Sequence, residues 1–175
     1  MKTETLIRWS GVAAIIAGIV GAAASFVTPE AGSPLEWAFF LGWIATLFGF
    51  MGIYAHQAEG SGSLGALGFA LLVVGTAYFL AGEPSLGGME ATALLALFGS
   101  VYSLGLVLLA VGTLKARKLP RWVAILWIVA VVVGLPGAFV PSLAALAYQL
   151  GAVAGGLAFV GAGYTLWSRP RARAS

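Results

Sequence analysis

The chain has 175 residues, of which 61% are hydrophobic and 9% are charged. Soluble domains are about 45–50% apolar and about 25% charged, so this composition excludes an ordinary water-soluble fold. There is no cysteine, which excludes disulfides, a thiol nucleophile and thiolate-bound metal or iron–sulfur centres. The composition predicts a single membrane-embedded domain over residues 1–175.

Six stretches are long and apolar enough for spanning helices, each of which needs about 20 such residues. In chain order they cover residues 6–28, 35–55, 63–81, 91–114, 121–140 and 142–167. Gly, Pro and Ser separate them, as turns require. Pro136 can kink the fifth helix, with Pro141 at the start of the sixth. The sequence predicts an all-α bundle of six transmembrane helices.

The first stretch has two interpretations. Lys2 and Arg8, followed by the small residues GAAAS, are typical of a cleaved signal peptide. Its apolar run of about 18 residues is longer than the usual 7–15, which favours an uncleaved anchor. Cleavage would leave five spans without changing the orientation of the others.

The charges predict the orientation. If the N-terminus is cytoplasmic, six spans place all nine basic residues in cytoplasmic segments: Lys2, Arg8, Lys115, Arg117, Lys118, Arg121, Arg169, Arg171 and Arg173. The outer segments then carry Glu30, Glu36, Glu83 and Glu90. The positive-inside rule therefore predicts that both termini are cytoplasmic.

Four of the basic residues, Lys115, Arg117, Lys118 and Arg121, form a cluster in one loop. We expect it to fix the cytoplasmic end of a helical hairpin. Polybasic segments also attract anionic lipid headgroups, and both roles can hold at once. A loop this short offers no groove-reading or base-stacking element, so we expect no nucleic-acid partner.

Small residues recur every seven positions in five of the six spans, for example Gly11 and Gly18, or Gly68 and Gly75. A step of seven nearly completes two helical turns, so each series forms one stripe along a helix. In lipid, helices associate where small residues let backbones approach. The pattern predicts glycine-mediated packing, represented in the first four spans and the sixth by Gly18, Gly49, Gly75, Gly112 and Gly156.

Ionisable residues are absent from the middle of the spans, so proton-pump, voltage-sensor, metal and haem roles lose support. His56 is interpreted as a helix-end residue near water, with a ligand-contacting or pH-sensing role as the alternative. The outer glutamates could surround a divalent cation, but solvated loop charge is the simpler interpretation. Nucleophile-elbow, P-loop and dinucleotide motifs are also absent. We expect no enzyme activity and no cofactor.

Gln149 lies inside the sixth span, where its amide needs a partner, and a neighbouring helix is favoured over a ligand. If a small-molecule pocket exists, its polar lining is expected between the fourth and sixth helices. The candidate residues are Gln149, Tyr148, Tyr102, Ser103 and Ser100. Trp43 and Trp127 lie deeper than the other tryptophans and suggest packing, or else the wall of such a pocket.

The stretch LGLVLLAVGTLKARKLPRWVAILWIVAVVVGL resembles a broad group of small, uncharacterised multi-pass bacterial membrane proteins. In that group a helix ends in basic residues and the next opens with Leu-Pro-Arg-Trp or a similar run. The ending GAGYTLWSRPR is similar to their last helix. The resemblance implies about six helices in a bacterial inner membrane, and it transfers no functional residues.

These observations favour an accessory or structural membrane protein that contacts lipids and either a membrane protein partner or further copies of itself. The alternative is a carrier of a small solute or lipid, similar to the six-helix substrate-binding subunits of vitamin importers. It would require the polar pocket named above.

Overall fold

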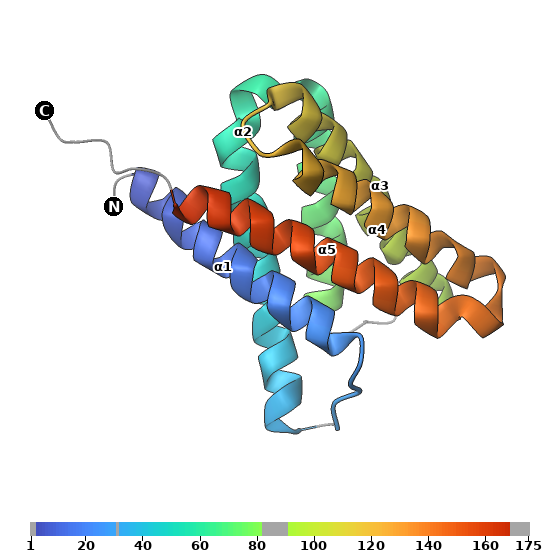
Figure 1. Cartoon of the computed structure of the whole chain (residues 1–175). Helices are drawn as coiled ribbons and strands as arrows, with labels where there is room; N and C mark the ends of the chain where they lie inside the picture. The colour runs from blue at the N-terminus through green and yellow to red at the C-terminus, as the bar shows by residue number, and fades with distance from the viewer. Residues whose placement is uncertain (1–2, 31, 82–90, 169–175) are drawn as a thin grey trace, which may run out of the picture.

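The computed structural model describes residues 3–30, 32–81 and 91–168, and this part of the chain is all-helical (Figure 1). Its elements are α1 (Thr3–Ala24), α2 (Pro34–Leu80), α3 (Ala91–Ala116), α4 (Arg121–Phe139), the 3₁₀ turn η1 (Pro141–Leu143) and α5 (Ala144–Trp167). Four helices, α1, α2, α3 and α5, are long and apolar enough to cross a membrane. The apolar part of α4, Arg121–Gly137, is shorter. The fold is that of a helical membrane protein.

Helix α2 differs from the sequence-based expectation of two helices joined by a polar loop. Helical structure continues through residues 56–61, and within α2 only Gly62 is non-helical, with φ 62° and ψ −161°. The described chain therefore has five α-helices where six were expected. The expected loop is absent because one glycine, which tolerates positive φ, makes the whole turn.

The two arms of α2, residues 34–61 and 63–80, lie side by side (Figure 1). The rings of Tyr54 and Phe69 stack with centroids 4.7 Å apart, and those of Trp43 and Phe79 stack at 4.8 Å. In a straight helix Trp43 and Phe79 would be about 54 Å apart, at 1.5 Å per residue. Gly62 thus reverses the chain and makes α2 a helical hairpin.

We predict that Gly62→Ala destabilises the fold by about 1–3 kcal/mol, because an L side chain is strained at this φ and ψ. The matched control is Gly99→Ala in α3, where an added Cβ meets nothing within 4 Å. That change should be neutral or stabilising, because Ala is the better helix former. Thermal melting in detergent compares them, and equal melting temperatures would contradict this account of the turn.

The ends of the helices follow local chemistry. Ser33 caps α2 by accepting the Glu36 N–H at 3.2 Å, and the Glu36 carboxylate accepts the Gly32 N–H at 2.6 Å. After α3, Arg117 adopts φ 54° and donates its N–H to the Thr113 carbonyl oxygen at 3.1 Å. Such left-handed caps usually carry glycine, so a basic residue occupies a strained position here.

The last expected break also takes a different form. Pro136 lies inside α4, which continues to Phe139, and Pro141 begins η1 rather than α5. The Val140 N–H returns to the Pro136 carbonyl oxygen at 2.9 Å, and Val140 itself is extended. The turn between α4 and α5 is therefore an extended residue followed by a 3₁₀ turn.

The helices contact one another in a simple order. α1 packs against α5 and α2, α2 also packs against α3, and α4 packs against α3 and α5. Over the described residues α3 and α5 make no contact. Fully buried Phe50, Ile53, Leu72, Leu109 and Trp127 mark the core where these helices meet.

Helices α1 and α5 run antiparallel in close backbone contact (Figure 1). A Cβ added to Gly11 would lie 2.7 Å from the Gly163 carbonyl oxygen, and one added to Gly156 would lie 2.5 Å from the Gly18 carbonyl oxygen. Real Cβ atoms essentially never approach so closely. The pairs Gly11–Gly163 and Gly18–Gly156 lie seven residues apart on each helix, so they belong to the same helix–helix register. This spacing matches the repeat in the sequence.

We predict that Gly18→Ala destabilises the protein by about 1–3 kcal/mol, the usual cost of overpacking a tight contact. Gly21→Ala in the same helix is the control, because a Cβ there meets nothing within 4 Å. Chemical or thermal unfolding in detergent should separate the two variants. If both unfold alike, the α1–α5 backbone contact contributes nothing measurable.

Candidate functional site

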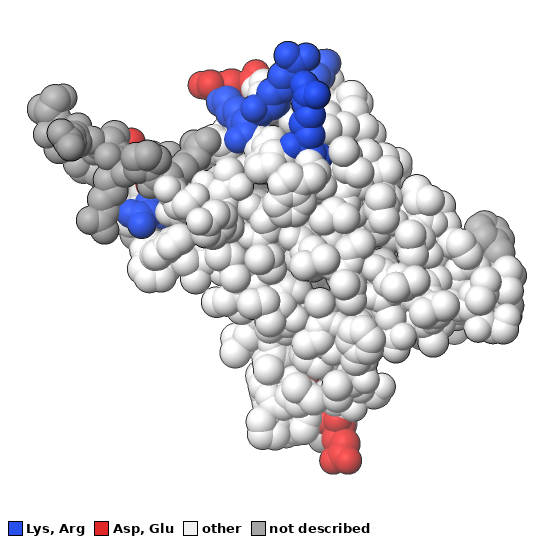
Figure 2. Space-filling view, in the orientation of Figure 1, with Lys and Arg blue, Asp and Glu red and all other residues white. Residues whose placement is uncertain are grey.

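The basic cluster lies at one end of the molecule, where α3 ends and α4 begins, and Figure 2 shows Lys and Arg gathered there. Lys115, Arg117, Lys118 and Arg121 are all exposed. Lys118 Nζ forms an ion pair with the Glu59 carboxylate at 3.2 Å. It is the one ion pair among the described residues, so the other three cations of the cluster have no carboxylate partner there.

Beneath this cluster, the end of the first α2 arm carries a group of buried polar side chains: His56, Gln57 and Ser61. His56 Nε2 lies 3.4 Å from the Lys118 carbonyl oxygen, and the Ser61 hydroxyl donates to the Ala58 carbonyl oxygen at 3.3 Å. The sequence suggested that His56 ends a helix near water. It is instead buried within α2, because the helix continues past it to Gly62.

Gln57 is fully buried, and neither its amide oxygen nor its amide nitrogen has a hydrogen-bond partner among the described residues. An unpartnered buried polar group costs roughly 1–3 kcal/mol of stability. Such groups mark sites of bound water, ligand or strain in native proteins. Sequence analysis missed Gln57 because it fell in the segment expected to be a loop, where an exposed amide needs no explanation.

An uninterrupted series of aromatic contacts crosses the interior of the bundle. From Trp43, which stacks on Phe79, ring contacts lead through Tyr102, Phe50 and Phe159 to Trp127, with centroids 4.7–6.2 Å apart. Along this series the rings come from α2, α3, α2 again, α5 and α4. Trp127 is fully buried, but its Nε1 has no partner among the described residues. Trp43 and Trp127 therefore occupy packing positions.

The structure does not assemble the pocket expected between the fourth and sixth spans, α3 and α5. These helices are not in contact, because α3 packs against α2 and α4 while α5 packs against α1 and α4. Tyr102 belongs to the aromatic series, Ser103 is half-buried on the same helix, and Ser100 donates to the Ala96 carbonyl oxygen at 2.7 Å. The two helices therefore do not pack directly against each other, and the pocket between them stays a prediction.

Tyr148 and Gln149, the α5 members of that predicted set, point elsewhere. Tyr148 is 62% exposed on the outside of α5. Gln149 is half-buried, and continuing the register of the α1–α5 glycine pairs by seven residues places it level with Ser25 of α1. A role for these residues in ligand binding stays a prediction.

The five glycines predicted to mediate packing all lie at helix contacts. Added Cβ atoms at Gly49, Gly75 and Gly112 would approach Ala14, Tyr102 and Gly65 to 3.0, 2.9 and 2.8 Å. Gly18 and Gly156 face each other across the α1–α5 contact. These positions join α1 to α2, the second α2 arm to α3, and α1 to α5.

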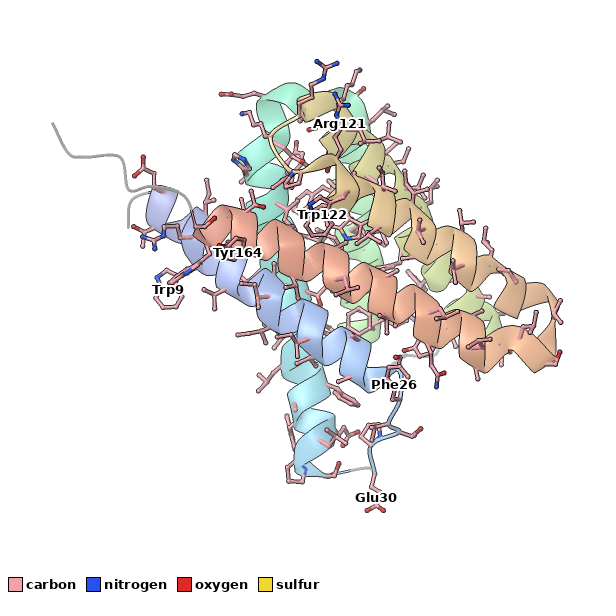
Figure 3. All side chains as sticks on the ribbon, viewed as in Figure 1. Trp9, Phe26, Glu30, Arg121, Trp122 and Tyr164 are labelled. Atoms are coloured by element: carbon pink, nitrogen blue, oxygen red, sulfur yellow. The ribbon has the colours of Figure 1, made fainter. Side chains whose placement is uncertain are left out.

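The predicted outer glutamates divide into two groups. Glu36 caps the start of α2, and Glu30 lies in the segment before it, at the end of the molecule away from the basic cluster (Figure 3). Glu83 and Glu90 lie outside the described residues. Within the described ranges no group of three or more His, Asp or Glu side chains is placed to hold a metal ion.

In comparisons with known proteins, no family model, curated protein or solved structure matches the chain. The resemblance to multi-pass bacterial membrane proteins therefore stays an expectation. The candidate site with the strongest structural evidence is the buried polar group at the basic end, with Gln57 at its centre.

We predict that Gln57→Met raises the free energy of unfolding by about 1–2 kcal/mol, because it removes an unpartnered amide and keeps the length of the side chain. Gln149→Met, at a half-buried position, is the control and should change stability less. Denaturant unfolding in detergent measures both. Destabilisation by Gln57→Met would show that bound water or a ligand satisfies the amide in the folded protein.

Proposed function

We propose that this chain is a six-pass protein of a bacterial cytoplasmic membrane, with both termini cytoplasmic. We further propose that it is an accessory subunit that binds a membrane protein partner and has no catalytic activity of its own. The two arms of α2 would count as separate passes, with α4 as another. The shorter arm, residues 63–80, has a length of about 27 Å at 1.5 Å per residue, close to the hydrocarbon thickness of about 30 Å.

The distribution of charge supports this orientation. Figure 2 shows Lys and Arg gathered at one end, with Asp or Glu side chains both beside them and at the opposite end, and an uncharged surface between the two ends. The basic end would face the cytoplasm under the positive-inside rule. Glu30 lies at the other end, near the start of α2 (Figure 3). A surface with charge only near its ends suits a protein that crosses a bilayer.

Exposed aromatic residues on α5 support the same placement. Tyr148 and Tyr164 are both more than 60% exposed, and they lie about 24 Å apart along the helix axis. Tyr and Trp are enriched at both membrane–water boundaries. Trp9, Trp122, Trp167 and Trp37 are exposed as well. The proposed orientation would put the first three in a belt at the basic end and Trp37 in a belt at the other.

The observation that carries the accessory function is the filled interior. The aromatic series from Trp43 to Trp127 crosses the bundle, and backbone contacts at glycines close the interfaces on both sides of α1. A packed interior of this kind favours a rigid bundle over a passage for solutes. The described connection between α3 and α4, residues 117–120, is short, and much of the available surface is the apolar side of the helices.

Native mass spectrometry of the chain, extracted from its own membrane with surrounding lipid retained, tests this proposal. We expect a second membrane protein in fixed stoichiometry, and the complex should persist in Gln57→Met because that residue is internal. A chain that is always alone would contradict the accessory function. Repeating the extraction at several detergent concentrations distinguishes a stable complex from co-extracted neighbours.

One observation favours a second candidate function, that of a carrier or receptor for a small polar molecule. Gln57 offers a donor and an acceptor that no described residue occupies. In this case the ligand would bind at the basic end of the bundle, beside His56 and Ser61, and not between α3 and α5. A chain that retains a discrete small molecule, and loses it in Gln57→Met, would favour this function over the first.

A further inference from the structure

Arg8 has an unusual environment for a cation near the end of a helix. It is half-buried on α1, its Nε is buried without a hydrogen-bond partner, and it forms no ion pair within the described part of the chain. We propose that Arg8, Trp9 and Trp167 form a site for the phosphate group of an anionic phospholipid. This inference rests on the membrane placement proposed above, and it concerns a different part of the molecule from the Gln57 group.

Trp167 fixes the orientation of the guanidinium group. The Arg8 Cζ atom lies 4.8 Å from the centroid of the Trp167 ring, so one face of the cation is covered by an aromatic face. Cation–π contacts of this type strengthen when water is excluded. The five N–H donors of arginine lie in the plane of the group, so stacking occupies a face and leaves the donors to be satisfied by an acceptor.

Trp9 completes the arrangement. Its ring meets that of Trp167 edge to face, with centroids 6.2 Å apart and an interplanar angle of 62°. Both indoles remain substantially exposed, at 59% for Trp9 and 40% for Trp167. Figure 3 shows Trp9 near the start of α1 and Tyr164 close by on α5. These amphipathic rings place Arg8 at the depth of the lipid headgroups.

The chemistry of arginine then selects the ligand. The planar fork of donors matches two phosphate oxygens at once, and such charge-assisted bonds are roughly twice as strong as neutral ones. Glu4 lies one helical turn before Arg8 and is the nearest carboxylate in sequence, but the two form no ion pair. Once the protein lies in a bilayer, a lipid phosphate is the hydrogen-bond acceptor that the Arg8 guanidinium group would reach.

The surrounding charge favours an anionic lipid over a zwitterionic one. Of the described basic residues, only Lys118 has a carboxylate partner. Lys115, Arg117 and Arg121 leave the same end of the molecule with net positive charge. Each basic residue near the surface contributes to the attraction of acidic headgroups. The net positive charge at this end attracts anionic lipids in general, and the Arg8 site would bind one of them in a defined position.

The test titrates delipidated protein in detergent with phosphatidylglycerol, or with phosphatidylcholine of the same acyl chains, and counts bound lipids by native mass spectrometry. We expect one preferred phosphatidylglycerol whose affinity falls about tenfold or more in Arg8→Gln, as the loss of hydrogen bonds to a charged group predicts. Arg121→Gln removes the same charge from the basic cluster and should change the affinity by less than threefold.

Two further variants keep the test informative if Arg8→Gln fails to fold. Arg8→Lys retains the charge but loses the planar fork, and Trp167→Leu retains the arginine but loses the stacking surface. Both should weaken phosphatidylglycerol binding while helicity by circular dichroism is unchanged. Equal losses in Arg8→Gln and Arg121→Gln, or equal affinity for the two lipids, would overturn the proposal. Displacement of the lipid by millimolar inorganic phosphate would also overturn it, because the site would then be one for free phosphate.

Cysteine labelling separates failure of this site from failure of the membrane placement. The chain has no native cysteine, so Ser33→Cys, Ser63→Cys and Lys118→Cys can each be probed with a membrane-impermeant maleimide in intact cells. The proposed topology predicts labelling at position 33 only. That result together with unaltered lipid binding in Arg8→Gln would reject the lipid site alone. Labelling at position 63 or 118 would reject the orientation on which both proposals depend.

Discussion

Close approach of helix backbones is the constraint on which this structure depends. In lipid, burial of leucine gives helices little reason to associate, so contact must come from packing between backbones. α1 shows how this works on two sides of one helix. Gly11 and Gly18 face α5, while Ser10 and Ala14 lie against Gly52 and Gly49 of α2. A small side chain in each direction lets α1 hold the two halves of the bundle together.

With the backbones so close, large side chains occupy the spaces between helix crossings. The aromatic series lies among these side chains, and it links α2, α3, α5 and α4 in one contact network. Phe50 is central, because it contacts both Tyr102 and Phe159. Helices whose backbones touch leave room for aromatic rings only where the helices diverge. The backbone contacts and the aromatic packing therefore depend on each other.

Hydropathy and glycine spacing allowed much of this fold to be predicted. Long apolar runs require helices in lipid, and the seven-residue series predicted the Gly11–Gly163 and Gly18–Gly156 faces, because backbone contact needs a small residue on each side. Which helices become neighbours could not be predicted in the same way. Periodicity identifies the face of a helix that is buried, but it carries no information about the helix that covers it. For this reason α3 and α5, expected to be neighbours around a pocket, turn out not to pack against each other.

The candidate site was harder to predict, because the composition of its segment indicated a loop where the structure has a helix. The run HQAEGSG is polar and glycine-rich, which is typical of a loop in an isolated sequence. In the folded chain Ser61 bonds back to its own helix, and Gly60 packs against Ala116 at the end of α3, so the helix continues to Gly62. Gln57 is thereby carried into the interior. There both its amide oxygen and its amide nitrogen lack a hydrogen-bond partner among the described residues.

The single-residue reversal at Gly62 has a consequence for how the chain enters the membrane. Because Gly62 alone joins the arms of α2, no loop has to be closed to bring them together. Contacts between near neighbours form quickly, since little chain entropy is lost in closing them. If each arm crosses the membrane, as in the proposed topology, the two can insert together as a preformed hairpin. The shorter, glycine-rich second arm would then gain its place in the bilayer through its partner, without needing to be recognised alone.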